Sequence, residues 1–152
     1  MKRTAVSVPE YNEQSRSNLE ERPDYFNYLA TTHANLLDVI IVDDASTDGS
    51  REAVEEYVRN NNPAFKAIYR ETNGQKVWAI RDGVNVADPN LDTILLTDFD
   101  SSIPDSSIPV FDEMLDKLHS DGNLGGLALR VDVEDKQSWL GYVHHLRYMN
   151  LL

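Results

Sequence analysis

The amino-acid sequence predicts an α/β fold in which a mostly parallel sheet is flanked by helices. Short apolar runs alternate with longer segments of helical periodicity along the chain. Two of the runs, Val39–Val42 and Ile94–Leu96, are continuously apolar, which is typical of strands buried on both faces of a parallel sheet. Strands and helices that alternate in this order imply right-handed crossovers between parallel neighbours.

Five segments have the composition of strands. The first is rich in β-branched residues, and we expect Pro9 to end it. The second stops at Asp43. The expected strands span residues 4–8, 38–42, 65–69, 93–97 and 127–133.

Helical segments lie between these strands. The first begins at Pro23, which a first helical turn tolerates, and Ser46, Thr47 and Asp48 are candidate caps for the second. Gly74 opens the third. The expected helices cover residues 23–36, a segment through 54–58, and residues 74–84, 107–119 and 138–152.

Size and charge bound the kind of protein. A chain of 152 residues can form one domain, so we expect a single domain over residues 1–152. The formal charge of −12 argues against nucleic acid as a partner. There is no cysteine and no signal-like start, so we expect a cytoplasmic location.

The acidic residues that follow the two apolar runs are the best candidates for a site. Asp43 and Asp44 follow the second strand, and Asp98 and Asp100 follow the fourth. Ligands of open α/β sheets bind beyond the carboxyl ends of the strands. Asp98 and Asp100 are two residues apart and could face one Mg²⁺ or Mn²⁺, whose coordination shell substrate phosphates usually complete.

Two basic residues lie on the helix that opens after Gly74. Lys76 and Arg81 are close to a helix N-terminus, which favours anions. They could therefore contact a phosphate that the same metal ion touches.

Four motifs, in order along the chain, resemble those of the family 2 glycosyltransferases, which have a Rossmann-like GT-A fold. Asp43 and Asp44 lie in the second motif, Lys76 in the third, and Asp98 and Asp100 form the Asp-x-Asp of the fourth. Arg81 stands where that family often has asparagine. The motifs span residues 6–13, 41–50, 74–83 and 95–100.

This resemblance implies a nucleotide-diphosphate-sugar donor, a UDP- or GDP-sugar, and an inverting transfer to an acceptor that the sequence does not identify. It also implies Mn²⁺ or Mg²⁺ at Asp98 and Asp100. By the same resemblance, the full-length protein could associate with the cytoplasmic face of a membrane, as the membrane-bound synthases of the family do. The residues expected to bind the donor are Pro9, Tyr11, Glu13, Asp43, Asp44, Lys76, Arg81 and Asp98.

A catalytic base is expected to be absent. In the resembled family this carboxylate lies well downstream of the Asp-x-Asp. Here Glu134 and Asp135 are the one acidic pair that could be mistaken for it, and they follow close behind a predicted strand. We therefore assign no catalytic residue. We expect a truncated GT-A domain that carries the donor-binding part and lacks the acceptor part.

Three alternatives remain open on the sequence. Residues 44–55 nearly fit a calcium-binding EF-hand loop, but a strand precedes them. A receiver domain would use Asp98 as phosphoacceptor, yet no serine or threonine lies between Asp121 and Lys136. A non-catalytic GT-A-like binding module would keep the donor residues without transferring sugar.

Overall fold

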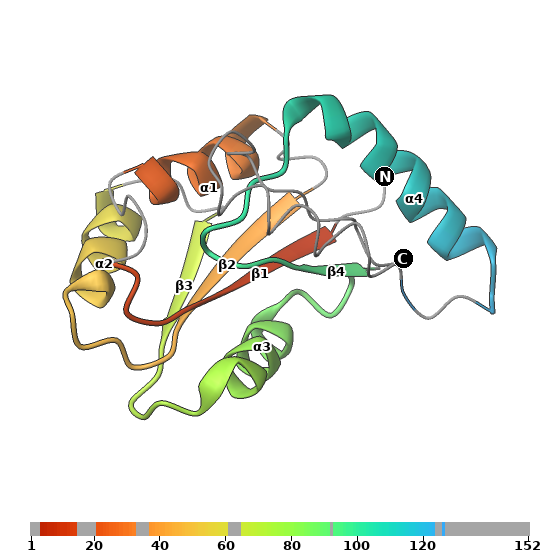
Figure 1. Cartoon of the computed structure of the whole chain (residues 1–152). Coiled ribbons are helices and arrows are strands. Elements are labelled where there is room, and N and C mark those ends of the chain that lie inside the picture. The colour runs from red at the N-terminus through yellow and green to blue at the C-terminus, as the bar shows by residue number, and fades with distance from the viewer. Residues whose placement is uncertain are drawn as a thin grey trace, which may run out of the picture. The chain divides into compact units, whose positions relative to one another are not determined.

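The structure is a computed structural model that describes residues 4–14, 21–32, 37–60, 65–91, 93–123 and 126 (Figure 1). The chain divides into two compact units, residues 1–103 and residues 104–152. None of the described helices is both long and apolar enough to span a bilayer. The expected strand at 127–133 and helix at 138–152 lie outside the described residues, and the single domain over residues 1–152 stays a prediction.

The first unit contains a sheet of four parallel strands. These are β1 (Thr4–Glu10), β2 (Leu37–Asp43), β3 (Phe65–Tyr69) and β4 (Thr93–Leu96), in the spatial order β3-β2-β1-β4. All three neighbouring pairs are parallel, which confirms the predicted sheet. The chain adds strands outward from β1 to β3 and then returns to the other side of β1. This reversal between β1 and β4 is a topological switch point, where α/β proteins bind ligands.

Helices cover both faces of this sheet. They are α1 (Glu21–Thr32), α2 (Ser50–Asn60) and α3 (Gln75–Val86). The crossovers through α1 and α2 step in one direction and the crossover through α3 steps back. Because each crossover is right-handed, α3 must cover the face opposite to α1 and α2. Figure 1 shows α3 on the other side of the sheet from α1.

The core lies at the centre of the sheet. Val39–Val42 of β2 are at most 1% exposed, and each such side chain contributes about 1.5–3 kcal/mol of burial. On the α3 face, Ala5, Ile40, Val42 and Ala79 form one cluster. Gly83 lets α3 approach closely, since a Cβ there would lie 2.3 Å from Ser7 Oγ.

The prediction that Pro9 ends the first strand is wrong by two residues, because β1 continues to Glu10. Ser7 O accepts a hydrogen bond from Thr97 N on the β4 side, and backbone groups alternate in direction along a strand. Pro9 therefore turns its missing N–H toward the β4 side, where pairing has already ended at Ser7. A proline costs no ladder hydrogen bond there.

The first two helices also begin at residues other than those predicted. α1 starts at Glu21, so Pro23 lies within its first turn, where its missing N–H is tolerated. α2 starts at Ser50, after Gly49 at a φ of +98°. Among the three candidate caps, Asp48 accepts the Ser50 N–H at 3.0 Å.

The second unit, as far as it is described, consists of a short 3₁₀ helix and one α-helix. These are η1 (Asp105–Ser107) and α4 (Ile108–Ser120). The helix expected at 107–119 is thereby confirmed to within one residue at each end.

Candidate functional site

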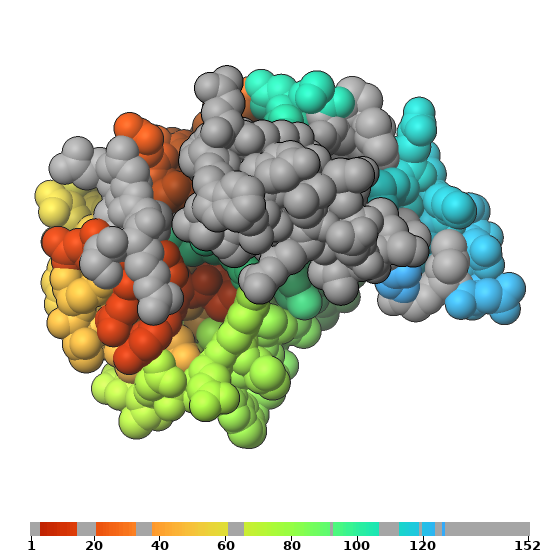
Figure 2. All heavy atoms as spheres, viewed as in Figure 1, coloured from red at the N-terminus to blue at the C-terminus, as the bar shows by residue number. Residues whose placement is uncertain are grey.

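A pocket of about 430 Å³ opens at the switch point, beyond the carboxyl ends of β1, β2 and β4. Two parts of the chain reach the surface on the face drawn in Figure 2. One is the segment that follows β1 (red), and the other runs from β3 into α3 (yellow-green to green). Most of the lining side chains are polar. The pocket is lined by Pro9, Glu10, Tyr11, Glu13, Asp44, Asn73, Gln75, Lys76, Ala79, Asp98, Phe99 and Asp100.

The turn after β4 brings two acidic side chains to this pocket. Ser101 N donates to Asp98 O at 3.0 Å, which closes a tight turn with Phe99 and Asp100 at its centre. The Phe99 side chain is only 2% exposed and packs on the ring of Phe26, with the ring centroids 5.7 Å apart. Asp98 and Asp100 are both exposed and both line the pocket. The structure thus brings both acidic residues of the turn to one pocket.

Lys76 is the basic residue within the pocket. It lies in the first turn of α3, and its ammonium group is paired with the carboxylate of Asp98. Both side chains are more than half exposed, at 58% and 53%, so water screens the pair. A cation at a helix N-terminus and two nearby carboxylates create a site that can take both an anion and a metal ion.

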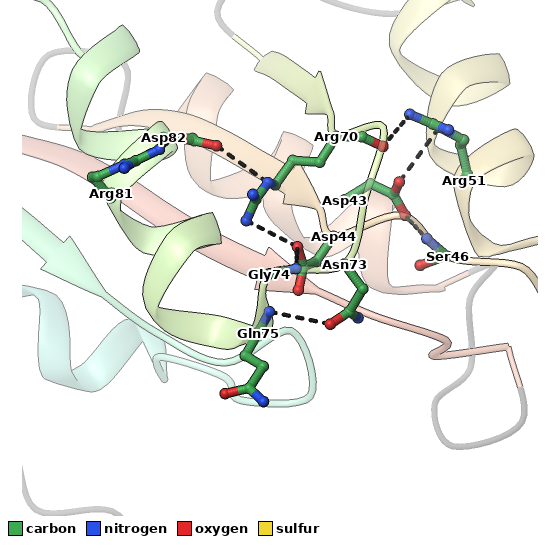
Figure 3. Close-up of polar contacts among 10 residues, drawn as sticks. All are labelled: Asp43, Asp44, Ser46, Arg51, Arg70, Asn73, Gly74, Gln75, Arg81 and Asp82. Atoms are coloured by element: carbon green, nitrogen blue, oxygen red, sulfur yellow. Dashed lines mark hydrogen bonds and ion pairs between the residues drawn. The ribbon is translucent and has the colours of Figure 1, made fainter.

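Asp44 is a buried carboxylate that joins β2 to the start of α3 (Figure 3). Its Oδ1 accepts the backbone N–H of Gly74 at 3.0 Å and lies 3.0 Å from Arg70 Nη1. Arg70 Nε in turn lies 3.2 Å from Asp82 Oδ2. Asp44 therefore fixes the loop between β3 and α3, which forms part of the pocket wall.

Asp43 points to the opposite face of the sheet. Its Oδ1 accepts the Ser46 N–H at 3.1 Å, and its Oδ2 lies 3.4 Å from Arg51 Nε of α2 (Figure 3). Asp43 and Asp44 therefore point in different directions, Asp43 toward α2 and Asp44 toward the start of α3. Asp43 is not among the lining residues.

Arg81 also lies away from the pocket. Its guanidinium stacks on Trp78, 4.0 Å from the ring centroid, and pairs with Asp82 at 3.1 Å. Five residues along a helix correspond to a rotation of about 140° from Lys76, which separates the two cations. The expectation that both contact one phosphate is therefore not supported by this geometry.

The residues that follow β1 form another part of the pocket wall, and the loop before α2 holds them in place. Asn12, at a φ of 53°, accepts the Thr47 N–H through Oδ1 at 2.8 Å, and its own N–H donates to Ser46 Oγ at 3.0 Å. Ser50 Oγ accepts the N–H groups of Glu13 and Gln14, each at 2.9 Å. The first two sequence motifs thus form one scaffold that places Pro9, Tyr11 and Glu13 at the pocket.

Glu10 is a buried acid beneath this scaffold. Its side chain is 1% exposed, and neither carboxyl oxygen has a hydrogen-bond partner among the described residues. Burial raises the pKa of Glu10 to about 8, and the nearby Asp43 carboxylate adds to the shift. Burial therefore favours the protonated form of Glu10 in the folded chain.

The donor set of the acidic turn fits a hard divalent cation. Among the described residues there is no group of three or more histidine, cysteine or acidic side chains that could hold a metal by itself. Asp98 and Asp100 supply two carboxylates in an open pocket, which leaves positions for phosphate and water oxygens. This is the usual arrangement for Mg²⁺ and Mn²⁺.

Several lining residues carried no signal in the sequence. Asn73 and Gln75 flank Gly74, and Asn73 Oδ1 accepts the Gln75 N–H at 3.1 Å. Gln75 has a φ of 67°, which only the folded loop reveals. Gly74 lets Arg70 reach Asp44, because a Cβ there would lie 2.6 Å from Arg70 Nη1 and 2.9 Å from Trp78 Cβ.

The chain is a member of a known enzyme class. The sequence model described as "Glycosyl transferase family 2" matches residues 5–150, so the chain belongs to this family. The four-stranded parallel sheet with flanking helices is the corresponding part of a GT-A fold. The strand order β3-β2-β1-β4 also excludes a receiver domain, in which the third strand lies on the other side of the first. An EF-hand is excluded because β2, not a helix, precedes residue 44.

The chain is similar to two curated polysaccharide synthases. The poly-β-1,6-N-acetyl-D-glucosamine synthase of Staphylococcus epidermidis is 25% identical over 115 residues, which are 76% of this chain and 26% of that protein. The chain therefore spans about a quarter of the length of the curated relatives it matches.

Solved structures show the same fold. The mannosyltransferase PcManGT of Pyrobaculum calidifontis, in complex with GDP-Man and Mn²⁺, superposes with a TM-score of 0.54 at 27% identity, covering 69% of this chain and 29% of its own. S. aureus TarS superposes with a TM-score of 0.59 at 24% identity, covering 89% of this chain and 24% of its own. At that identity TarS supports the fold alone.

Proposed function

We propose that this chain binds a nucleotide-diphosphate sugar together with a divalent cation, as the donor-binding part of an inverting family 2 glycosyltransferase. The observation that carries the proposal is the pocket itself. At the switch point of the sheet it combines the Asp98 and Asp100 carboxylates with the Lys76 ammonium group. An open pocket that offers both ligands for a hard cation and a positive charge suits a diphosphate.

The charge of the chain supports a metal ion as part of the site. A protein with a formal charge of −12 repels an anionic donor unless a cation offsets its field. A divalent cation at Asp98 and Asp100 would supply that charge and stabilise the diphosphate as it leaves. The Mn²⁺ in the 27% identical mannosyltransferase structure is in line with this choice.

The remaining wall of the pocket is suited to a nucleoside. Tyr11 is 42% exposed beside the pocket and offers an aromatic face to a base. Asp44 is the one member of the Asp43–Asp44 pair that lines the pocket, so we propose it, and not Asp43, as the residue that faces the base. The base, uracil or guanine, and the sugar stay open in this proposal, as does the acceptor. A cytoplasmic location, with any membrane association residing in the full-length protein, belongs to the same proposal.

Isothermal titration of the chain with UDP and with GDP tests the proposal, each in Mn²⁺, in Mg²⁺ and in chelator. We expect one nucleotide to bind in the presence of metal and to weaken at least about tenfold in chelator. Asp100→Asn should lose this metal-dependent part and keep its melting temperature, since the side chain is exposed. Glu52→Gln, on exposed α2 surface, is the matched loss of one charge and should bind like the parent. Equal binding with and without chelator would refute the metal assignment, and absence of binding would refute the donor pocket.

A further inference from the structure

The acidic turn at the pocket is held by a residue that lies 77 positions earlier in the chain. Arg22, in the first turn of α1, donates from Nε to Phe99 O at 2.6 Å and from Nη1 to Ser102 Oγ at 2.9 Å. Its Nη2 donates to Ser101 O. All three acceptors lie within residues 99–102, which run from the centre of the acidic turn to just beyond it.

Aromatic residues of α1 fix the Arg22 guanidinium and the turn together. The guanidinium carbon lies 4.7 Å from the ring centroid of Tyr25 and 5.1 Å from that of Phe26. Tyr25 OH accepts the Ile103 N–H at 2.5 Å, and Phe26 packs on Phe99. The turn is thus attached to α1 at positions 99, 101, 102 and 103, while Asp98 and Asp100 face the pocket.

We infer that Arg22 is a positioning residue for the metal ligands: it holds the turn so that the Asp98 and Asp100 carboxylates face one divalent cation. Arg22 is not among the residues that line the pocket, so its role here is to hold the turn. The inference rests on the proposed function, since it takes these two carboxylates as ligands. It adds a residue outside all four sequence motifs.

The chemistry of arginine explains why this position would not accept lysine. A planar guanidinium presents five N–H groups in a fixed fork and can serve three acceptors on different residues at once. An ammonium group is a point donor at the end of a flexible chain and cannot span the same acceptors. Partners that orient metal ligands typically change metal affinity 10–100-fold when they are replaced.

The test compares Arg22→Lys with the parent chain in titrations of the nucleoside diphosphate that the parent binds, with Mn²⁺ and with chelator. We expect Arg22→Lys to weaken binding in Mn²⁺ by about 10–100-fold and to leave binding in chelator unchanged. A merely structural role would lower both affinities alike. Tyr25→Phe, which loses only the hydroxyl bonded to Ile103, should shift affinity in the same direction by less. Arg59→Lys, at the exposed end of α2, is the matched control for the same exchange away from the pocket and should bind like the parent.

Hydrogen exchange of the segment 98–103 is the second readout and needs no metal. Arg22→Lys should exchange faster there than the parent, with the amides of β2 unchanged. Parent-like Mn²⁺ affinity together with parent-like exchange in Arg22→Lys would overturn the inference while the proposed function stands. A parent chain without any metal-dependent binding would overturn the proposed function and the metal part of this inference together. In that case the exchange data would still decide whether Arg22 holds the turn.

Discussion

Asp44 Oδ1 accepts the backbone N–H of Gly74 at 3.0 Å, and this bond joins the end of β2 to the start of α3 across 30 residues of sequence. The same oxygen lies 3.0 Å from Arg70 Nη1. A single buried carboxylate therefore both aligns the loop at the pocket and balances the charge of Arg70 (Figure 3).

Asp44→Asn should destabilise the fold by about 2–3 kcal/mol. The amide can still accept the Gly74 N–H, but it no longer balances the charge of Arg70, whose pairing with the more exposed Asp82 remains. Losing one member of a buried pair leaves a charge uncompensated. Asp82→Asn is the matched variant and should cost about 1 kcal/mol or less, because its side chain is 26% exposed. Urea unfolding at pH 7 measures both variants, and equal losses would contradict the role of Asp44 as the main counter-charge of Arg70.

Gly83→Ala should destabilise the chain by about 1–3 kcal/mol, although alanine favours helices more than glycine does. The added Cβ would lie 2.3 Å from Ser7 Oγ, so either the Ser7 side chain must change rotamer or α3 must move away from the sheet. Ser7→Ala removes this oxygen, which is buried without a hydrogen-bond partner among the described residues. The nearest remaining atoms would be Val42 Cγ2 at 3.2 Å and Ser7 Cβ at 3.3 Å. Thermal unfolding of the double variant should therefore recover most of the loss, and a purely additive double variant would argue against this contact.

The sequence predicted the fold because its signals are local. Continuous apolar runs mark strands such as β2, and acids that follow them mark the carboxyl edge of the sheet. The positions of Asp98, Asp100 and Lys76 at one pocket follow from those signals together with the order of the motifs.

The sequence could not decide matters that depend on direction or on distant contacts. It left Asp43 and Asp44 equivalent, whereas the two-residue period of β2 sends them to opposite faces. It grouped Arg81 with Lys76, whereas the helical rotation separates them. No local sequence pattern around Arg22 indicates that this residue contacts a turn 77 residues later. Tertiary contacts of that length leave no local pattern to read.

Glu10→Gln should stabilise the chain increasingly as pH rises. The pKa of Glu10 is about 8 in the folded chain and about 4.5 in the absence of burial, so the folded state holds a proton that the unfolded state has lost between these values. The parent therefore loses stability from about pH 4.5 to about pH 8, at no more than about 1.4 kcal/mol per pH unit, whereas glutamine does not titrate. Urea unfolding of both chains at pH 5, 6.5 and 8 should show a difference that widens with pH. Parallel pH profiles would contradict the buried neutral acid, and Glu56→Gln, on exposed α2 surface, is the control.

Lys76→Gln should change two affinities in opposite directions if Asp98 is a metal ligand. The Lys76 ammonium group is paired with the Asp98 carboxylate, and a metal ion that takes this carboxylate must displace it. An exposed ion pair contributes about 0.2–1 kcal/mol, so its removal should tighten Mn²⁺ binding in the absence of nucleotide by no more than about fivefold. The same change removes a positive charge from the pocket, so the affinity for the nucleoside diphosphate with Mn²⁺ should fall about tenfold.

Electron paramagnetic resonance of free Mn²⁺ measures the affinity for the metal ion alone, and calorimetry measures the affinity for the nucleoside diphosphate. Lys66→Gln, on the exposed side of β3, removes the same charge outside the pocket and should change neither. A loss of both affinities in Lys76→Gln would mean that the lysine supports the shape of the acidic turn and does not compete with the cation for it.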